Sequence, residues 1–174
     1  MVPQSILLVP MAPAERAIDR YRRRLDPSSS FRSPAHVTVL FPFMAPDTIT
    51  GAVLHELGEL FGRYDRFDFS LSEVRWFDDR VVYLAPTPAG PFQELTAAVT
   101  AAFPQYPPYE GAFDEVIPHV CVGREARKLF MQAAGWLVKR HLPITGTVSE
   151  VWLMTIGDPE PHYHLRKAFP LRDR

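Results

Sequence analysis

Two matching segments decide the fold expected for this chain: Pro34-Ala35-His36-Val37-Thr38-Val39-Leu40-Phe41 and Pro118-His119-Val120-Cys121-Val122-Gly123-Arg124. In a β-strand, successive side chains point to opposite faces of the sheet. Each segment therefore predicts a strand that buries its valines and carries its histidine on the other face. The residue two places after the histidine, Thr38 or Cys121, shares the histidine's face.

The rest of the sequence repeats around these two segments. Hydrophobic patterns predict strands at 6–10, 67–77, 81–86, 144–156 and 163–171, besides the two histidine strands, and helices at 14–25, 48–62, 91–103 and 125–141. The order strand, helix, strand, helix, strand therefore occurs twice, and Leu71-Ser72-Glu73-Val74 is echoed by Val148-Ser149-Glu150-Val151.

The repeat predicts the fold class. We expect an α+β fold in one bilobal domain, residues 1–174, with lobe 1 at about 5–77 and lobe 2 at about 80–171. Each lobe is a β-α-β-α-β unit related to the other by an approximate two-fold axis. Their antiparallel sheets would face a central cleft that holds both histidines.

Composition limits the classes of partner. Of the 174 residues 47% are apolar and 22% are charged, which suits a chain that buries a core. The net charge is -1, and the longest basic run is Arg22-Arg23-Arg24. A protein that holds long nucleic acid usually has a strongly basic face, so we expect a small nucleotide or an RNA terminus instead.

The cysteine content and the N-terminal segment bear on the compartment. Cys121 is the only cysteine, which excludes an internal disulfide framework and a Cys-rich zinc cluster. The apolar run 6–10 is much shorter than the roughly 20 residues of a membrane span. We expect a cytoplasmic monomer with no membrane partner.

Two imidazoles facing one cleft suit in-line displacement at phosphorus. One histidine accepts a proton from the attacking hydroxyl or water, and the other donates a proton to the departing oxygen. The unperturbed pKa of histidine, about 6.5, allows either role near neutrality. The Thr38 hydroxyl would donate to a nonbridging phosphate oxygen. No Asp, Glu and His cluster has metal-ligand spacing, so we expect no metal and no cofactor.

The chain resembles the two-histidine (2H) phosphoesterase superfamily, in its 2′-5′ RNA ligase-like branch. The resemblance spans nearly the full chain and rests on the motifs His36-Val37-Thr38-Val39 and His119-Val120-Cys121-Val122, the repeat, and the segments 106–119 and Glu150-Val151-Trp152-Leu153. It implies a bilobal α+β fold and metal-independent opening of 2′,3′-cyclic phosphates to 2′-phosphates, with 2′-5′ ligation in some members. It further implies that His36 is the general acid, His119 the base and Thr38 a phosphate ligand.

The second motif departs from the family pattern, because Cys121 stands where Thr or Ser is usual. A thiol is a weak hydrogen-bond donor. Cys121 could be a small substitute for the hydroxyl residue. It could instead weaken or abolish turnover and leave a nucleotide-binding or RNA-end-binding protein, which is the alternative function. A structural protein whose repeats simply pack together is a third alternative.

Other side chains are weaker candidates. Arg124 could donate two hydrogen bonds to a phosphate, although an Arg at the start of a helix is commonly solvated. Aromatic rings could stack on a base, although aromatic residues are more often part of the core; the candidates are Phe41, Phe43, Trp76 and Tyr163. We interpret the remaining histidines, His55, His141, His162 and His164, as surface or structural residues.

Overall fold

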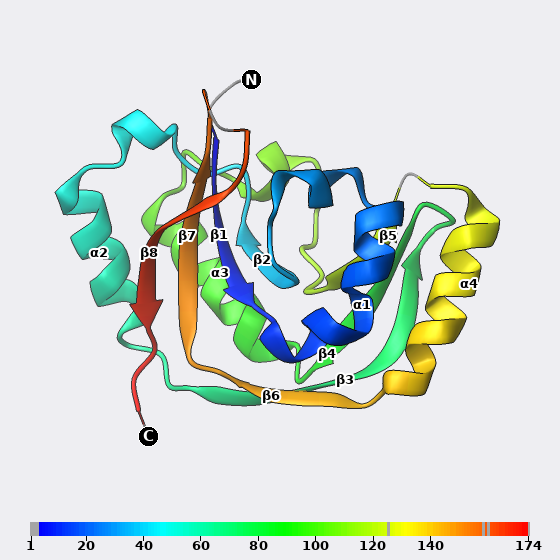
Figure 1. Ribbon diagram of the computed structural model, residues 1–174. Helices are drawn as coiled ribbons and strands as arrows, with labels where there is room; N and C mark the ends of the chain where they lie inside the picture. The colour runs from blue at the N-terminus through cyan, green and yellow to red at the C-terminus, as the bar shows by residue number, and fades with distance from the viewer. Residues whose placement is uncertain (1–3, 125, 158, 160, 174) are drawn as a thin grey trace.

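A computed structural model describes residues 4–124, 126–157, 159 and 161–173 (Figure 1). Its strands are β1 (Gln4–Pro10), β2 (His36–Leu40), β3 (Phe67–Phe77), β4 (Val81–Thr87), β5 (Val120–Arg124), β6 (Ile144–Val148), β7 (Glu150–Ile156) and β8 (His164–Pro170). Its α-helices are α1 (Ala12–Leu25), α2 (Gly51–Phe61), α3 (Gly90–Ala102) and α4 (Lys128–Val138). The predicted α+β class is confirmed.

All eight strands belong to one curled antiparallel sheet, in the order β6-β3-β4-β5-β2-β1-β7-β8. The strands of the two sequence repeats are interleaved in it. Strand β3 of the first repeat pairs with β4 and β6, whereas β7 of the second repeat pairs with β1 and β8. As a result β2 and β5, the two histidine strands, are neighbours at the centre of the sheet.

The segment 144–156 differs from the single strand predicted for it. It forms two strands, β6 and β7, which lie near opposite ends of the sheet order. Ser149 separates them, and its carbonyl accepts a hydrogen bond from the Leu171 amide. Figure 1 shows β6 along the lower edge and β7 rising from it. Alternation in the sequence indicates strand structure but not the partner strand, which is why the division was missed.

The main core lies between one face of the sheet and the four helices. Alternate strand residues, among them Val37, Val39, Val120 and Val122, are at most 1% exposed and belong to one cluster. The helices contribute their buried stripes to the same cluster: Ala14, Ala17 and Ile18 of α1, Leu57 and Phe61 of α2, Phe92, Leu95 and Val99 of α3, and Met131, Ala134 and Val138 of α4. The opposite face of the sheet therefore carries the residues between the valines.

Helix α1 brings the chain to the end of the histidine strands. Arg22, Arg23 and Arg24 in its last turn interact favourably with the negative end of the helix dipole. The helix stops at Asp26, whose extended backbone and side-chain carboxylate begin the short 3-10 helix 27–31. In the part of the chain that the structure describes, no helix is both long and apolar enough to span a membrane.

Candidate active site

The two histidines lie on the sheet face opposite the helices. In the antiparallel pair of β2 and β5, Val37 is directly opposite Val120. Continued by one residue each way, this register sets His36 opposite Cys121 and Thr38 opposite His119. Side chains of directly opposite residues share a face. We call this surface, which carries His36, Thr38, His119 and Cys121, the histidine face.

Both imidazole rings are held by the same backbone contact. His36 Nδ1 lies 2.7 Å from the Pro34 carbonyl oxygen, and His119 Nδ1 lies 2.8 Å from the Ile117 carbonyl oxygen. Because a carbonyl oxygen only accepts, each Nδ1 carries the hydrogen and donates it. In the neutral rings Nε2 is therefore the acceptor nitrogen. Each half of the site therefore presents the Nε2 atom of one histidine.

Burial favours the neutral form of both rings. It is the main cause that lowers the pKa of His36 to about 4, and the charges of Arg22 and His119 add to it. Burial also lowers the pKa of His119, with a contribution from Arg124. Both rings are therefore proton acceptors near neutrality, and a bound anion would be needed to favour the imidazolium form.

A β-bulge directs Arg124 onto the histidine face. Tyr83 is paired with Cys121 but Val82 with Gly123, so Val122 is an extra residue in β5. Val122 is buried in the main core, and Gly123 abuts Leu25 of α1, so both face the helices. The alternation is shifted by one residue, and Arg124 returns to the side of His119. Its charge acts on the pKa values of His119, Cys121, Tyr109 and Tyr163.

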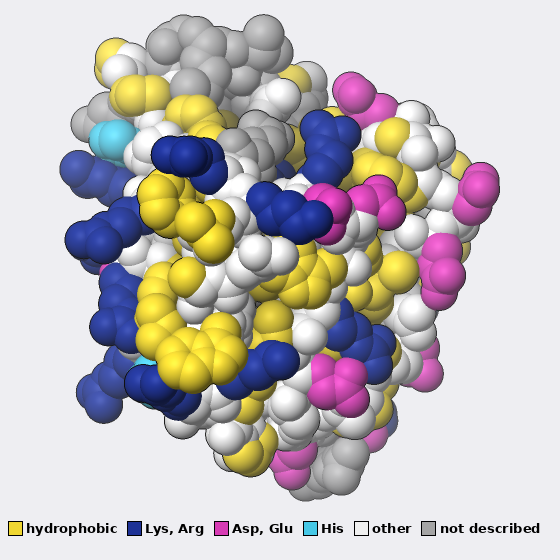
Figure 2. Space-filling view, turned by 90° about the vertical axis from the view of Figure 1, so that its right-hand side faces the viewer, with side chains coloured by type: hydrophobic (Ala, Val, Ile, Leu, Met, Phe, Trp, Pro, Cys, Tyr) yellow, Lys and Arg dark blue, Asp and Glu magenta, His cyan; other side chains and the backbone are white. Residues whose placement is uncertain are grey.

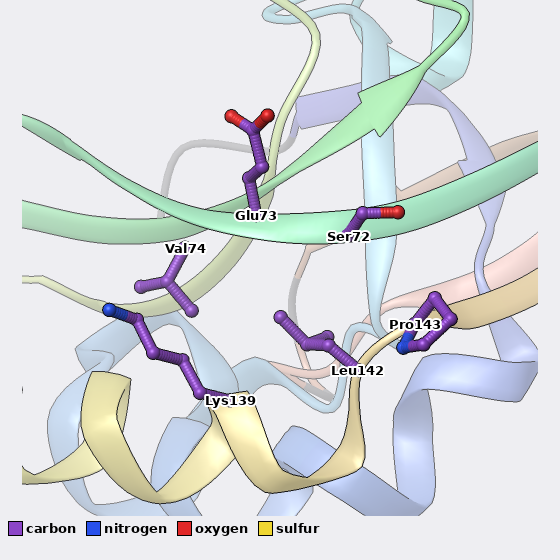
Figure 3. A pocket seen from close by; sticks show the side chains of 6 residues that line it. All are labelled: Ser72, Glu73, Val74, Lys139, Leu142 and Pro143. Atoms are coloured by element: carbon purple, nitrogen blue, oxygen red, sulfur yellow. The ribbon is translucent and has the colours of Figure 1, made fainter.

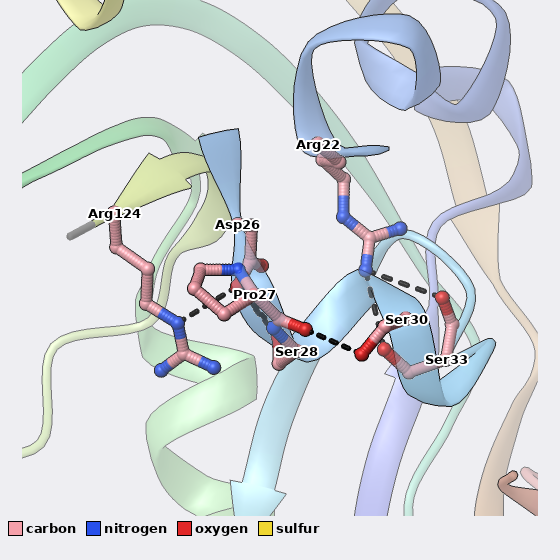
Figure 4. Close-up of polar contacts among 7 residues, drawn as sticks. All are labelled: Arg22, Asp26, Pro27, Ser28, Ser30, Ser33 and Arg124. Carbon is pink, nitrogen blue, oxygen red and sulfur yellow. Dashed lines mark hydrogen bonds and ion pairs between the residues drawn. The ribbon is translucent and has the colours of Figure 1, made fainter. Parts of the chain in front are cut away.

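Asp26 anchors Arg124 (Figure 4). The Asp26 Oδ1 atom accepts hydrogen bonds from Arg124 Nε at 2.9 Å, from the Ser28 amide at 3.0 Å and from Ser28 Oγ at 2.7 Å. Burial by itself would raise the pKa of this carboxyl, but the Ser28 hydrogen bonds and the Arg124 charge lower it. Nearby, buried Arg22 donates to the carbonyl and the hydroxyl of Ser33.

Cys121 is a protonated thiol in this site. Burial raises its pKa to about 12, and the negative charge of Asp26 acts in the same direction. The thiolate form is therefore excluded near neutrality. A thiol is a weak hydrogen-bond donor, so Cys121 is a poor donor to a phosphate oxygen and Arg124 is the stronger anion-binding group on this side.

Two aromatic residues that we did not predict pack against His119. Its ring makes edge contacts with Phe77, at 5.0 Å between centroids, and with Tyr83, at 5.6 Å. Phe77 and Tyr83 are stacked at 4.2 Å. The predicted candidate Trp76 is one residue off: it packs against the main core, near Gly135 of α4. Phe67, Phe69 and Leu71 face the core, so strict alternation along β3 would place Phe77 on the core face as well. The register shift between Leu71 and Glu73 moves Phe77 to the histidine face, and the sequence contains no direct signal of that shift.

The other predicted aromatic residues divide into two groups. Phe43 is only 5% exposed and packs edge-on against Phe103 and Tyr106, so it is a core residue that offers no ring face to a ligand. Phe41 and Tyr163 pack against a small second cluster of Ile6, Leu8 and Met154. Leu8 is opposite Thr38, so this cluster adjoins Thr38 on the histidine face.

Tyr109 is a further site residue that the sequence did not reveal. Burial raises the pKa of its hydroxyl, and the neighbouring Thr38 side chain acts in the opposite direction, which sets the phenol beside Thr38. Its backbone has φ 51°, the left-handed region that is unfavourable for a non-glycine residue, and its amide donates to the Phe41 carbonyl at 2.6 Å. Strained residues held in this way cluster at functional sites. The preceding Pro107-Pro108 was the only signal of a constrained loop.

The remaining features do not contribute to this site. His55, His141 and His164 are exposed, and His162 is half-buried. Within residues 4–124, 126–157, 159 and 161–173, no three His, Cys, Asp or Glu side chains are arranged to hold a metal ion. An open hollow lies between β3 and the connection from α4 to β6 (Figure 3), and its lining includes none of the predicted site residues.

Comparison with known proteins assigns the family. The model of the 2′-5′ RNA ligase superfamily matches residues 9–160. The chain belongs to this superfamily. The resemblance to the two-histidine phosphoesterases is thereby confirmed. No curated protein sequence shows a significant match to the chain.

Solved structures of similar fold cover almost the whole length of this superfamily member. E. coli LigT complexed with 3′-AMP is 19% identical, with a TM-score of 0.59 and coverage of 97% of this chain and 98% of that one. E. coli LigT complexed with phosphate is 19% identical, with a TM-score of 0.58 and 99% coverage of both chains. TT0787 of Thermus thermophilus is 15% identical, with a TM-score of 0.65 and coverage of 98% and 99%. At these identities the likeness concerns the fold.

Proposed function

We propose that this protein is a metal-independent phosphoesterase that opens 2′,3′-cyclic phosphates, at RNA ends or on small nucleotides, to 2′-phosphates. The observation that carries the proposal is the pair of histidines on one sheet face, each with Nδ1 bonded to a backbone carbonyl. The tautomer leaves both Nε2 atoms for proton transfer. Membership of the 2′-5′ RNA ligase superfamily supports the same chemistry.

The reaction requires two proton transfers on opposite sides of phosphorus. His119 Nε2 accepts a proton from water as the water oxygen bonds to phosphorus. The bond from phosphorus to the 3′-oxygen breaks in line, and His36 donates its Nε2 proton to that oxygen. The product is a 2′-phosphate with a free 3′-hydroxyl. An RNA 5′-hydroxyl acting in place of water would give a 2′-5′ linkage.

The low pKa of His36 is compatible with its role as acid once substrate is bound. In the empty site burial holds this pKa at about 4. The negative charge of a bound phosphate favours the imidazolium form and raises the pKa of both histidines. Thr38, beside Tyr109, and Arg124, held by Asp26, would stabilise the charge on the nonbridging oxygens.

The choice of a nucleotide substrate rests on the site and on the relatives. Arg124 suits a phosphate, because the guanidinium can donate two parallel hydrogen bonds to its oxygens. The stacked Phe77 and Tyr83 form an aromatic wall beside His119 on which a base could pack. LigT structures with 3′-AMP and with phosphate are consistent with such a ligand.

Incubation with a 2′,3′-cyclic mononucleotide tests the proposal. We expect a 2′-monophosphate as the product, with a rate that a metal chelator does not change. His36→Ala and His119→Ala should each lower kcat by about 100-fold or more, as loss of a general acid or base does. His141→Ala, at an exposed histidine, is the matched control and should behave like the wild type. Formation of the 3′-monophosphate would contradict the proposal.

A second function is favoured by one observation, the neutral, buried thiol of Cys121 where the family usually has a hydroxyl group. A protein lacking the second hydroxyl donor could bind nucleotides or RNA ends without turning them over. Such a protein would gain thermal stability with a nucleotide, through linkage of binding to folding, but release no product. Product analysis together with thermal shifts on the same preparation separates the two functions.

A further inference from the structure

Helices α1 and α4 contact each other and both pack against β5, so they lie side by side (Figure 1). The outward residues of α1 include Arg16, Arg20, Arg23 and Arg24, and those on and beside α4 include Arg127, Lys128, Lys139 and Arg140; all eight are exposed. We call these side chains, together with Tyr21, Leu129, Phe130 and Trp136, the α1/α4 surface.

The charge on this surface departs from the average of the chain. Residues 12–25 and 127–141 contain nine of the 19 Lys and Arg but two of the 20 Asp and Glu. Two of the exposed cations are paired with carboxylates, Arg23 with Asp19 and Lys128 with Asp79. A chain with a net charge of -1 therefore has one strongly basic side. Figure 2 shows Lys and Arg gathered on one side of this view, and Asp and Glu mainly on the other.

Aromatic rings alternate with these cations. Arg20 lies over Tyr21 at 4.6 Å, Arg127 over Phe130 at 5.4 Å and Arg140 over Trp136 at 4.2 Å, each measured to the ring centroid. Phe130 is 52% exposed and Trp136 is 59% exposed. More than half of each ring is in contact with solvent, so packing in the core does not account for an aromatic residue at either position. Guanidinium groups and exposed rings together are the groups that bind the phosphates and bases of a single strand.

The surface is continuous with the histidine face. Helix α1 ends one residue before Asp26, and α4 begins four residues after Arg124. The hydrogen bond from Arg124 Nε to Asp26 therefore joins the residue after α1 to a residue shortly before α4. A strand whose terminal phosphate lies beside Arg124 would therefore leave the site directly over the basic ends of both helices.

We propose that the α1/α4 surface binds the body of a single-stranded RNA whose terminal phosphate occupies the histidine site. This rests on the proposed function and selects an RNA end, rather than a free mononucleotide, as the substrate class. The sequence-based expectation of no long nucleic acid used the average charge, which conceals how the fold gathers the cations. Charge also disfavours a second copy of the chain as occupant, because two such surfaces would repel each other.

Binding measurements with two ligands test the proposal. One ligand is a ten-nucleotide RNA ending in a 2′,3′-cyclic phosphate, and the other is the cyclic mononucleotide, each measured with His119→Ala protein to prevent turnover. We expect the RNA to bind at least about tenfold more tightly at low salt. Its affinity should fall with salt concentration, with a slope that grows by about 0.7 for each phosphate contact.

Surface variants in the same background locate the contact. Arg20→Gln combined with Arg140→Gln should reduce the salt slope by about one unit or more. Trp136→Ser should weaken RNA binding by about fivefold or more, through lost stacking. Neither should change mononucleotide affinity. Arg63→Gln is the charge-matched control, because Arg63 is exposed beside α2, on the other side of the molecule from α4 (Figure 1).

The outcomes separate this proposal from the proposed function. Equal affinity for RNA and mononucleotide, or surface variants that match Arg63→Gln, would overturn the RNA surface while leaving cyclic phosphate opening by the wild type intact. Tight, salt-dependent RNA binding without opening of the mononucleotide would support the surface and count against the enzyme. Loss of binding to anionic phospholipid vesicles in the surface variants, with RNA binding unchanged, would assign the surface to a membrane instead and overturn the proposal.

Discussion

Val37 lies directly opposite Val120 across the antiparallel pairing of β2 and β5. Both side chains are buried under the helices, so this apolar pair fixes the register of the strands that carry the histidines. In that register His36 and His119 are diagonal neighbours, whose Cα atoms are typically about 7–8 Å apart. Two rings at this separation can each reach an oxygen of one phosphate. The core contact therefore sets the geometry of the site on the opposite face.

The low pKa of His36 predicts a specific pH dependence of stability. The folded-state pKa is about 4, against 6.5 for the unperturbed group. The unfolded chain therefore binds more protons between these values, and the free energy of unfolding decreases as pH falls from about 6.5 to 4. The loss attributable to His36 is at most about 3 kcal/mol.

Urea unfolding at pH 7 and at pH 4.5 measures this effect. His36→Gln should lose less stability than the wild type over that interval, because Gln does not titrate. His141→Gln, at an exposed position, should follow the wild type. The folded-state pKa of Asp26 is lowered from 3.8, so its contribution is lost below this interval. Equal pH dependence of the wild type and His36→Gln would contradict the interpretation.

The state of Cys121 leads to a second prediction. With a pKa of about 12 the thiol is protonated near neutrality. We expect iodoacetamide to modify it far more slowly than free cysteine at pH 8, because the thiolate is the reactive form. Cys121→Thr introduces a stronger donor beside the phosphate and should raise kcat by roughly threefold to tenfold.

Cys121→Ala is the control for this substitution. It removes the thiol without supplying a hydroxyl, so kcat should stay at or below the wild-type value. An increase in kcat in Cys121→Ala as large as that in Cys121→Thr would show that donor strength is not the cause. A wild type without turnover that gains activity only in Cys121→Thr would favour the binding function.

The central part of the site could be predicted from the sequence because it depends on alternation alone. In each motif one valine stands between the histidine and the residue two places further on, so the valine must face away from both. The structure places these valines, Val37 and Val120, in the core. The repeat also predicted that the two motifs would meet. The same alternation fails along β3, because the register shift between Leu71 and Glu73 exchanges the two faces beyond it and brings Phe77, not Trp76, to the histidine face.

The remaining parts of the site and the basic surface depend on tertiary contacts, which the sequence of one strand does not reveal. The bulge at Val122 changes the face of Arg124, and only the pairing with β4 reveals it. Tyr109 reaches Thr38 from a loop about 70 residues further along the chain, in a backbone conformation that its residue type disfavours. The basic surface arises from two helices about 100 residues apart in the chain that pack side by side. Tertiary packing decides all three.

The Asp26–Arg124 contact predicts an effect on substrate binding. Asp26→Asn keeps the size of the side chain but removes the charge that holds the guanidinium, so we expect KM to rise by about tenfold with a smaller change in kcat. Arg124→Gln should raise KM by a similar factor. The increase in KM of the double variant should be much smaller than the product of the two single increases, because both substitutions disrupt one interaction.

Steady-state kinetics of the four proteins in this cycle give the coupling. Asp65→Asn is a suitable control, because Asp65 forms an exposed ion pair with Arg172 near the C-terminal end of the described chain. Effects of Asp26→Asn and Arg124→Gln that multiply in the double variant would show that the carboxylate does not act through the guanidinium.

Gly123 offers the most direct test of how the bulge builds the site. A Cβ at this position would lie 2.8 Å from the Leu25 Cβ, a backbone-proximal atom that cannot move without shifting the end of α1. Gly123→Ala should therefore destabilise the fold by about 1–3 kcal/mol through overpacking. Because Asp26 follows Leu25, the shift should also displace the carboxylate that holds Arg124, and KM should rise.

Gly51→Ala provides the matched control, because a Cβ there contacts no atom within 4 Å. It should leave KM unchanged. Combining Gly123→Ala with Leu25→Ala removes the side-chain methyl groups but keeps the clashing Leu25 Cβ, so KM should remain high even though the core is smaller. Recovery of KM in this double variant would show that the rest of the Leu25 side chain, and not the backbone of α1, transmits the effect. A normal KM in Gly123→Ala itself would mean that Asp26 and Arg124 keep their contact independently of this packing.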